Sequence, residues 1–170
     1  MSIIKINNKT LCPEGHHEVV LAAVYSIGLQ PGYKDESPKP KHIYVFELAE
    51  KIPSGPLAGQ PYVVSAIYTD SLNEKSRLYA AVKALRGGLT AQELQTDAFD
   101  PASLIGLSCT IVTVNQVRAG KLMPSIVSII KRDNSAPLLT PTLDRSKVPD
   151  WVKRMQDQRL DKPNSVNNAA

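Results

Sequence analysis

The sequence predicts an all-β fold: a five-stranded antiparallel barrel with a helical insertion between strands 3 and 4. Three observations support this prediction. Five segments are rich in β-branched, aliphatic and aromatic residues, which suit a pleated, half-buried surface. Stretches rich in Pro and Gly separate several of them, and the longest helical pattern lies between the third and fourth segments. The predicted strands are residues 17–30, 41–50, 60–69, 107–115 and 122–131.

Glycine and proline refine the strand assignments. Gly28 is expected to mark a bend or bulge in the first strand, and residues 31–40 form a loop that is long for a hairpin. Arg118-Ala-Gly-Lys121 predicts the tip of a hairpin between strands 4 and 5, because glycine supplies the positive φ that such a turn needs. Pro124 predicts an edge or a bulge in strand 5, since proline has no N–H to donate.

Capping signals define the helical insertion. Ser71-Leu-Asn-Glu74 has the spacing of a capping box and predicts a helix start, and Gly87 supplies a left-handed stop. Thr90-Ala-Gln-Glu93 repeats the capping-box spacing and predicts a short second helix. The residues expected on the apolar face of the first helix are Leu72, Leu78, Tyr79, Val82 and Leu85.

Length and composition bound the organisation of the chain. Its 170 residues suffice for one domain with a proper core. We expect an N-terminal arm at 1–15, a barrel domain at 16–133, and a C-terminal tail at 134–170 in which residues 149–160 form a short helix. The formal net charge of +4 permits a polyanionic partner without requiring one.

Cysteine usage and hydropathy bear on the compartment. The two cysteines lie far apart in the sequence, so no disulfide framework is predicted. No uncharged run approaches membrane-spanning length, and the N-terminus lacks the apolar core of a signal peptide. We therefore expect a cytoplasmic protein that contacts no membrane.

The order of three strands, a helical insertion and two strands is that of an OB-fold barrel, and a β-sandwich with an inserted helix is the alternative. OB-folds bind oligonucleotides over strands 2 and 3 and the loops beside them. Five of the nine aromatic residues fall between residues 33 and 68, and residues 107–132 contain four basic residues and no acidic one. Aromatic rings for base stacking beside cations for phosphates are what single-strand binding requires.

The candidate site follows from this pattern. Strand 2 is apolar or aromatic at both parities, so the pattern leaves open which parity lines the barrel. We favour Tyr44 and Tyr68 over Phe46 as outward-facing residues, because a phenol tolerates partial exposure; packing in the core is the competing interpretation. The candidate nucleic-acid-binding residues are Tyr33, Lys41, Tyr44, Tyr62, Tyr68, Arg118 and Lys121.

Other chemistries find little support in the sequence. Cys12 followed by His16-His17-Glu18 offers metal-ligand types, but no CxxC pair or second cluster at zinc spacing accompanies it. The chain contains no nucleophile elbow, P-loop, paired-carboxylate motif or dinucleotide fingerprint. We expect no catalytic residues, no metal site and no cofactor, and hence a protein that is not an enzyme.

Three stretches of the sequence are similar to those of a known protein family. The chain resembles, over about residues 15 to 132, a family of phage- and prophage-encoded OB-fold proteins regarded as single-stranded DNA-binding proteins of phage replication. The motifs that carry the resemblance are Phe46-Glu47-Leu48, Ser71-Leu72-x-Glu74-Lys75-Ser76 and Leu104-Ile105-Gly106-x-x-Cys109.

The resemblance implies single-stranded DNA binding without sequence preference in phage-type DNA replication or recombination, in the host cytoplasm if the protein is phage-encoded. Replication or recombination proteins are then candidate partners, and homo-oligomerisation is left open. The alternative is a protein–protein adaptor or virion-associated OB or sandwich domain. In that alternative the C-terminal helix around Trp151 docks a partner.

Overall fold

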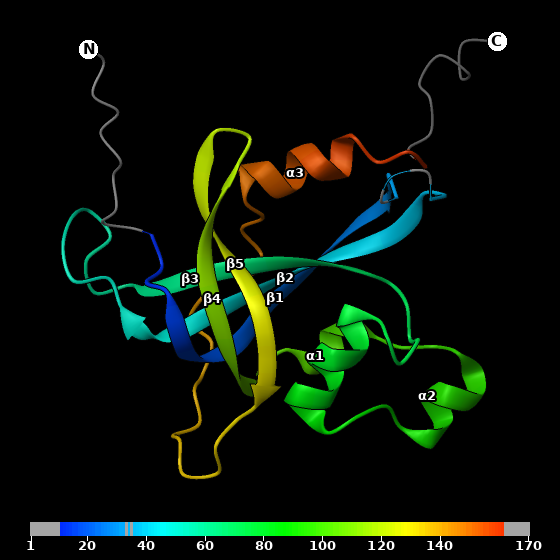
Figure 1. The fold of residues 1–170 in the computed structure, drawn as a ribbon, viewed down its shortest axis with the longest axis horizontal. Coiled ribbons are helices and arrows are strands. Elements are labelled where there is room, and N and C mark those ends of the chain that lie inside the picture. The colour runs from blue at the N-terminus through cyan, green and yellow to red at the C-terminus, as the bar shows by residue number, and fades with distance from the viewer. Residues whose placement is uncertain (1–10, 33, 35, 162–170) are drawn as a thin grey trace.

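The structure is a computed structural model that describes residues 11–32, 34 and 36–161 (Figure 1). It is mostly β, with one five-stranded antiparallel sheet and few helices. No helix in the described part of the chain is long and apolar enough to cross a membrane. The elements are β1 (Gly15–Gln30), β2 (Lys39–Lys51), β3 (Pro61–Thr69), α1 (Arg77–Arg86), α2 (Ala91–Thr96), the 3-10 helix η2 (Pro101–Leu104), β4 (Ser108–Arg118), β5 (Lys121–Lys131) and α3 (Asp150–Asp157).

The strands follow the order β3-β2-β1-β4-β5, so β1 pairs with both β2 and β4. The predicted five strands, with helices between the third and the fourth, are confirmed. The edge strands β3 and β5 contact each other, but no hydrogen-bonded ladder joins them among the described residues. The sheet is therefore strongly curved without being closed by pairing. Strand β5 lies at an edge, as Pro124 predicts.

Two irregularities bend β1. The register against β2 shifts between Leu21 and Ala23, and again between Ser26 and Leu29 around Gly28. Gly28 has φ +63°, a conformation that favours glycine, so the predicted bend at this position is confirmed. The first shift changes which side chains face the main core, because one extra residue reverses the alternation along a strand.

The main core lies between the inner face of the sheet and helix α1. Helix α1 buries Leu78, Val82 and Leu85 against the sheet. The predicted left-handed stop at Gly87 is confirmed, with φ +93°. The predicted start at Ser71 is wrong, because the helix begins five residues later and Ser76 accepts the N–H of Tyr79 as its N-cap. Residues 71–75 instead form a loop with a turn at Glu74 and Lys75.

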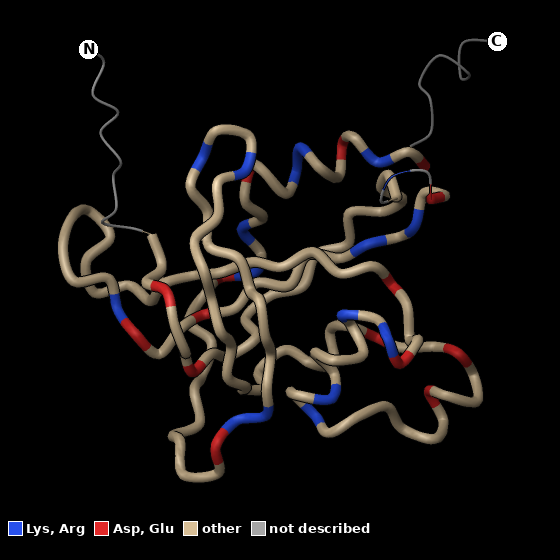
Figure 2. Tube along the Cα trace, viewed as in Figure 1, with Lys and Arg blue, Asp and Glu red and all other residues tan. Residues whose placement is uncertain are grey.

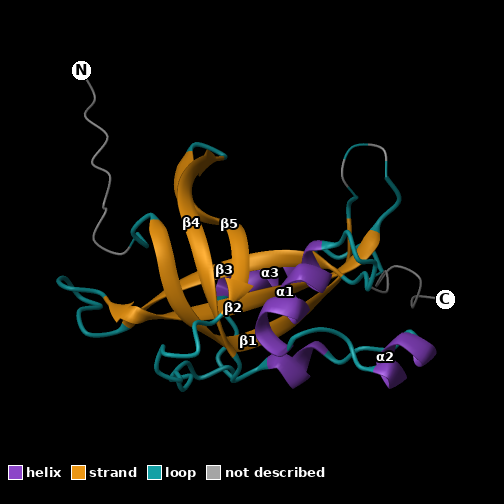
Figure 3. Ribbon diagram, turned by 60° about the horizontal axis from the view of Figure 1, so that its bottom comes forward, coloured by secondary structure: helices purple, strands orange, loops and turns teal. Residues whose placement is uncertain are grey.

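Helix α2 has the cap that the sequence predicts. The Thr90 hydroxyl accepts the N–H of Glu93, and the Glu93 carboxylate accepts the N–H of Thr90. The same carboxylate pairs with Arg86 at 2.5 Å, which ties the end of α1 to the start of α2. These bonds fix the insertion as a folded unit beside the sheet (Figure 3).

The C-terminal segment forms a second layer on the outer face of the sheet. Helix α3 is confirmed close to its predicted position, and Val152 on it is fully buried. The segment is held along its length by hydrogen bonds to Glu47, Tyr25, Ser26 and Leu29. The second core cluster contains Ala23, Tyr25, Ile27, Ile43, Val45 and Val152. The described part of the predicted tail is thus packed against the sheet over much of its length.

Candidate functional site

Three tyrosines chosen from the sequence are not at the surface. Tyr44 is 0% exposed, and Tyr62 and Tyr68 are each 5% exposed. The prediction that Tyr44 and Tyr68 face outward is wrong, because both rings lie in the main core with centroids 5.0 Å apart. Burial raises the pKa of Tyr68 to about 12. In this conformation none of the three rings is available to stack on a base. Tyr33 lies outside the described residues.

The second layer explains why the strand pattern misled. Both parities of β2 are apolar because both are buried: Tyr44 and Phe46 face the main core, and Ile43 and Val45 face the cluster under α3. A strand covered on both faces has no alternation to read. The buried side chain of Val152 shows that α3 belongs to the fold.

The three cationic residues predicted from the sequence make different contacts. Arg118 and Lys121 are exposed at the tip of the β4–β5 hairpin, where they pair across the two-residue turn. The Arg118 guanidinium donates to the Ser125 hydroxyl at 3.1 Å. Lys41 is half-buried, and its ammonium donates to the Pro31 carbonyl at 3.1 Å. The structure therefore brings Arg118 and Lys121 together and anchors Lys41 to the loop before β2.

The β4–β5 hairpin carries positive charge at both ends (Figure 2). Residues 107–132 contain no acidic residue, while Lys131 and Arg132 follow at the end opposite the tip. The hairpin extends beyond the other strands in both ribbon views (Figures 1 and 3). Its surface also exposes the apolar side chains of Val117, Met123, Val127 and Ile130.

Trp151 is a functional candidate that the sequence analysis did not include among the nucleic-acid-binding residues. It is the single tryptophan of the chain, and its side chain is 37% exposed on α3. Arg154 follows three residues later, a spacing that places two side chains on the same side of a helix. An exposed indole beside a guanidinium is suited to stacking on a planar base.

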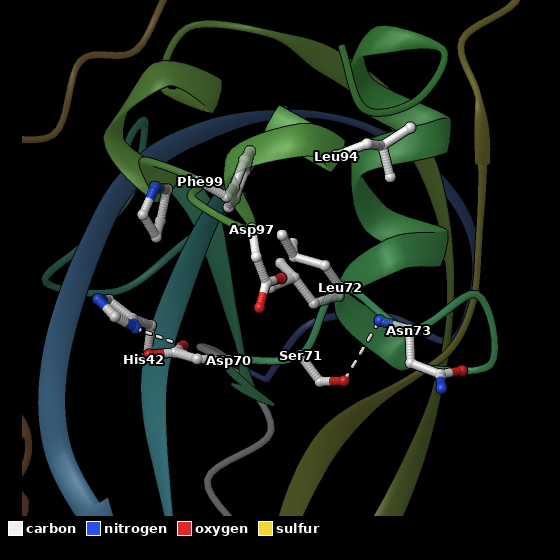
Figure 4. A pocket seen from close by; sticks show the side chains of 10 residues that line it. His42, Asp70, Ser71, Leu72, Asn73, Leu94, Asp97 and Phe99 are labelled. Atoms are coloured by element: carbon white, nitrogen blue, oxygen red, sulfur yellow. Dashed lines mark hydrogen bonds and ion pairs between the residues drawn. The ribbon is translucent and has the colours of Figure 1, made fainter. Parts of the chain in front are cut away.

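A cleft opens between the helical insertion and the ends of β2 and β3 (Figure 4). Its volume is about 590 Å³. His42 on β2 and Asp70 after β3 lie at one side, with their Nδ1 and Oδ1 atoms 2.6 Å apart. Asp97, the C-cap of α2, points into the cleft from the opposite side (Figure 4). Apolar walls come from Leu72, Leu78, Leu94, Phe99 and Pro101.

The chemistry of the cleft is limited by its geometry. The second ring nitrogen of His42 points away from Ser71 (Figure 4), and the Ser71 hydroxyl accepts the N–H of Asn73 at 3.3 Å. Ser71, His42 and Asp70 are therefore not arranged as nucleophile, base and orienting acid. Within the described ranges, no group of three or more His, Cys, Asp or Glu side chains is placed to hold a metal ion. What the cleft offers is two carboxylates beside apolar walls.

Cys12 and His17, near the N-terminus, make structural contacts. The Cys12 thiol is buried and lies 4.0 Å from the Thr113 hydroxyl. Burial raises the pKa of that thiol. His17 contacts the Pro13 carbonyl at 2.6 Å. These contacts hold the start of the described chain to β4.

No family model and no curated protein matches the chain.

Proposed function

We propose that this chain is an OB-fold protein that binds single-stranded DNA without strong sequence preference, in phage-type replication or recombination. The OB-fold assignment is supported by the strand order, in which β1 pairs with β2 and β4, and by the helical insertion between β3 and β4. The DNA-binding assignment rests on the projecting β4–β5 hairpin, which lies in a stretch without acidic residues and carries cations at both ends.

The mechanism combines electrostatics with base contacts. Arg118 and Lys121 attract phosphates at the hairpin tip, and Lys131 does so at its base. Release of condensed counterions then drives binding, so affinity falls as salt is added. Exposed apolar side chains on the hairpin and the indole of Trp151 supply surface for unstacked bases. Because these contacts read no base edges, binding tolerates any sequence.

The test is a titration of fluorescent oligo-dT, with a duplex of the same length, at low and physiological salt. We expect single-strand-selective binding that weakens as salt rises. The double variant Arg118→Ala/Lys121→Ala should reduce the slope of log affinity against log salt by about 1.4, or about 0.7 for each lost phosphate contact. A slope unchanged by the double variant would show that the hairpin tip does not contact phosphate.

Lys51→Ala is the matched control. Lys51 is exposed at the end of β2, outside the β4–β5 hairpin, and its truncation removes one positive charge where the double variant removes two. Oligonucleotide affinity should change little in this variant. A fall in log affinity in Lys51→Ala half as large as in the double variant would indicate a response to net charge rather than to a site. An absence of binding at low salt would overturn the proposed function.

The adaptor alternative is less well supported. A docking helix needs a free apolar face, but Val152 and Met155 on α3 pack against the sheet. Leu138 and Leu160 are exposed in the C-terminal segment and are the residues that favour the alternative. A partner that requires these leucines, with no oligonucleotide binding by the intact chain, would favour the adaptor function instead.

A further inference from the structure

We propose that the cleft between the helical insertion and the ends of β2 and β3 binds an organic cation: an ammonium or guanidinium group on an apolar stem. The cleft is distinct from the basic hairpin, and this inference does not depend on DNA binding. The inference rests on a cavity of about 590 Å³, on two carboxylates among the residues that line it, and on a wall of apolar side chains (Figure 4).

The size and the walls of the cleft suit a small ligand or one long side chain. Binding sites for small molecules commonly measure about 300–1,000 Å³ and combine apolar walls with a few polar groups. Leu72 and Phe99 are half-buried along the wall, and Leu94 leaves 61% of its side chain exposed there. A ligand that covers Leu94 removes apolar surface from water, which favours binding.

The charge of the cleft determines the sign of the ligand. Asp70 and Asp97 line it together with His42, which contacts Asp70, and none of its described lining residues is Lys or Arg. The Asp97 carboxylate has no hydrogen bond or ion pair with any described residue. The chain as a whole has a net charge of +4, so this acidic hollow runs against the general charge of the protein. A phosphate would be repelled here, whereas a cation would find acceptors on two sides.

Asp97 is held in place by the backbone. It caps α2 at φ 49°, a left-handed conformation that few residues other than Gly, Asn and Asp adopt readily. Its N–H bonds to the Glu93 carbonyl, which fixes the position of its backbone beside the cleft, and its side chain is exposed. Across the cleft, His42 orients Asp70 through the 2.6 Å contact. Asp70 is thus preorganised, which lowers the ordering cost of binding a ligand there.

Two sources could supply this chemistry: a free amine, or a Lys or Arg side chain in a peptide. The test is an NMR titration of the ¹⁵N-labelled full chain with phenethylamine, and separately with the blocked peptide acetyl-Leu-Arg-Leu-amide. We expect amide shifts confined to the cleft, centred on Leu72, Asn73 and Asp97. Tighter binding of the amine identifies a free ligand, and tighter binding of the peptide identifies a side chain. If neither probe shifts these amides, the inference is wrong.

Matched probes and variants isolate the charge. The neutral isostere 2-phenylethanol should bind about fivefold more weakly than phenethylamine. Asp97→Asn should weaken amine binding by a similar factor, and asparagine tolerates the left-handed backbone, so this variant keeps the fold. Glu74→Gln is the control, because Glu74 is exposed on the same insertion but does not line the cleft. Equal affinity for the alcohol and the amine, or equal loss in Glu74→Gln and Asp97→Asn, would overturn the inference.

The outcome is independent of the DNA titration. A cation in the cleft contacts none of Arg118, Lys121 and Trp151. Asp97→Asn should therefore leave oligo-dT affinity within about twofold of the parent. Cation binding without DNA binding would leave this inference standing and overturn only the proposed function.

Discussion

The carboxylate of Glu47 on β2 accepts both the backbone N–H and the hydroxyl of Thr142, a residue 95 positions later in the chain. The N–H lies 2.9 Å from Oε1 and the hydroxyl 2.9 Å from Oε2, and the N–H of Leu143 also bonds to Oε1. Glu47 is only 3% exposed. A buried carboxylate without a cation is stable only when such donors surround it. This contact joins the C-terminal segment to the outer face of the sheet.

Glu47→Gln should destabilise the protein by about 2 kcal/mol, because the amide has one acceptor oxygen and places an N–H group against backbone donors. The expected fall in Tm is about 4–8 °C for a chain of this size. Urea denaturation and a thermal scan measure both quantities. Thr142→Val removes only the hydroxyl donor and should cost about 1 kcal/mol. A Glu47→Gln variant as stable as the parent would show that these bonds contribute no net stability.

Val152 also holds the C-terminal segment to the sheet, through apolar packing. Its side chain is 0% exposed against Ile43 and Val45. Val152→Ala should lower the free energy of unfolding by about 2 kcal/mol, because it removes buried methyl groups and leaves a cavity. The control is Val127→Ala, since Val127 is 53% exposed and its truncation should cost less than about 0.5 kcal/mol.

The fluorescence of Trp151 reports whether the C-terminal segment stays packed on the sheet. Because it is the only tryptophan and adjoins Val152, its emission monitors whether α3 remains on the sheet. If the C-terminal segment is a part of the domain, this emission and the far-ultraviolet circular dichroism should change together in urea. A tryptophan transition well below the circular-dichroism transition would mean that α3 unfolds separately.

The β4–β5 turn stores strain at Ala119. Ala119 has φ 51° and Gly120 has φ 74°, the pair of positive angles found in two-residue hairpin turns. An alanine in this conformation costs about 1–2 kcal/mol relative to its preferred geometry. Ala119→Gly should therefore stabilise the protein by up to about 1 kcal/mol, after the entropy gained by the unfolded chain is subtracted. Urea denaturation measures the change.

Ala80→Gly should change the stability in the opposite direction. Ala80 is exposed within α1, where glycine costs about 1 kcal/mol relative to alanine. The two substitutions are chemically identical and differ only in backbone conformation. Destabilisation of similar size by both would mean that position 119 does not hold a left-handed conformation in solution.

The sequence predicted most of the strands because their signals are local. Each of these signals depends only on residues close to it in the sequence: the alternation along a strand, the bend at Gly28, and the turn at Ala119–Gly120. The pairing of β4 with β5 follows from that turn. The start of α1 was misplaced for a related reason. Ser71 and Ser76 each offer a capping hydroxyl, and the choice between them depends on the turn that Asn73 forms by accepting the N–H of Lys75.

The candidate site was predicted less well because it depends on contacts between distant segments. Whether Tyr44 or Ile43 faces solvent cannot be read from β2 when a segment a hundred residues away covers the outer face. The Glu47–Thr142 contact is of that kind. The cations at the hairpin tip were predictable, since Arg118 and Lys121 flank a turn that the sequence itself specifies. The cleft was not predictable, because His42 and Asp97 come to line the same cleft only through the packing of the insertion.

Cys109 should make stability fall in alkaline solution. It is 0% exposed, and burial raises the pKa of its thiol to about 12, with a smaller contribution from the Glu18 carboxylate. In the unfolded chain the pKa of a cysteine thiol is about 8.5. Between these values the folded protein keeps a proton that the unfolded chain releases. Its contribution is therefore fully present below about pH 8.5 and is lost as pH rises, by at most about 1.4 kcal/mol per pH unit. Urea denaturation at about pH 7.5 and about pH 10 should show a smaller loss in Cys109→Ala than in the parent, and equal losses would contradict the assignment.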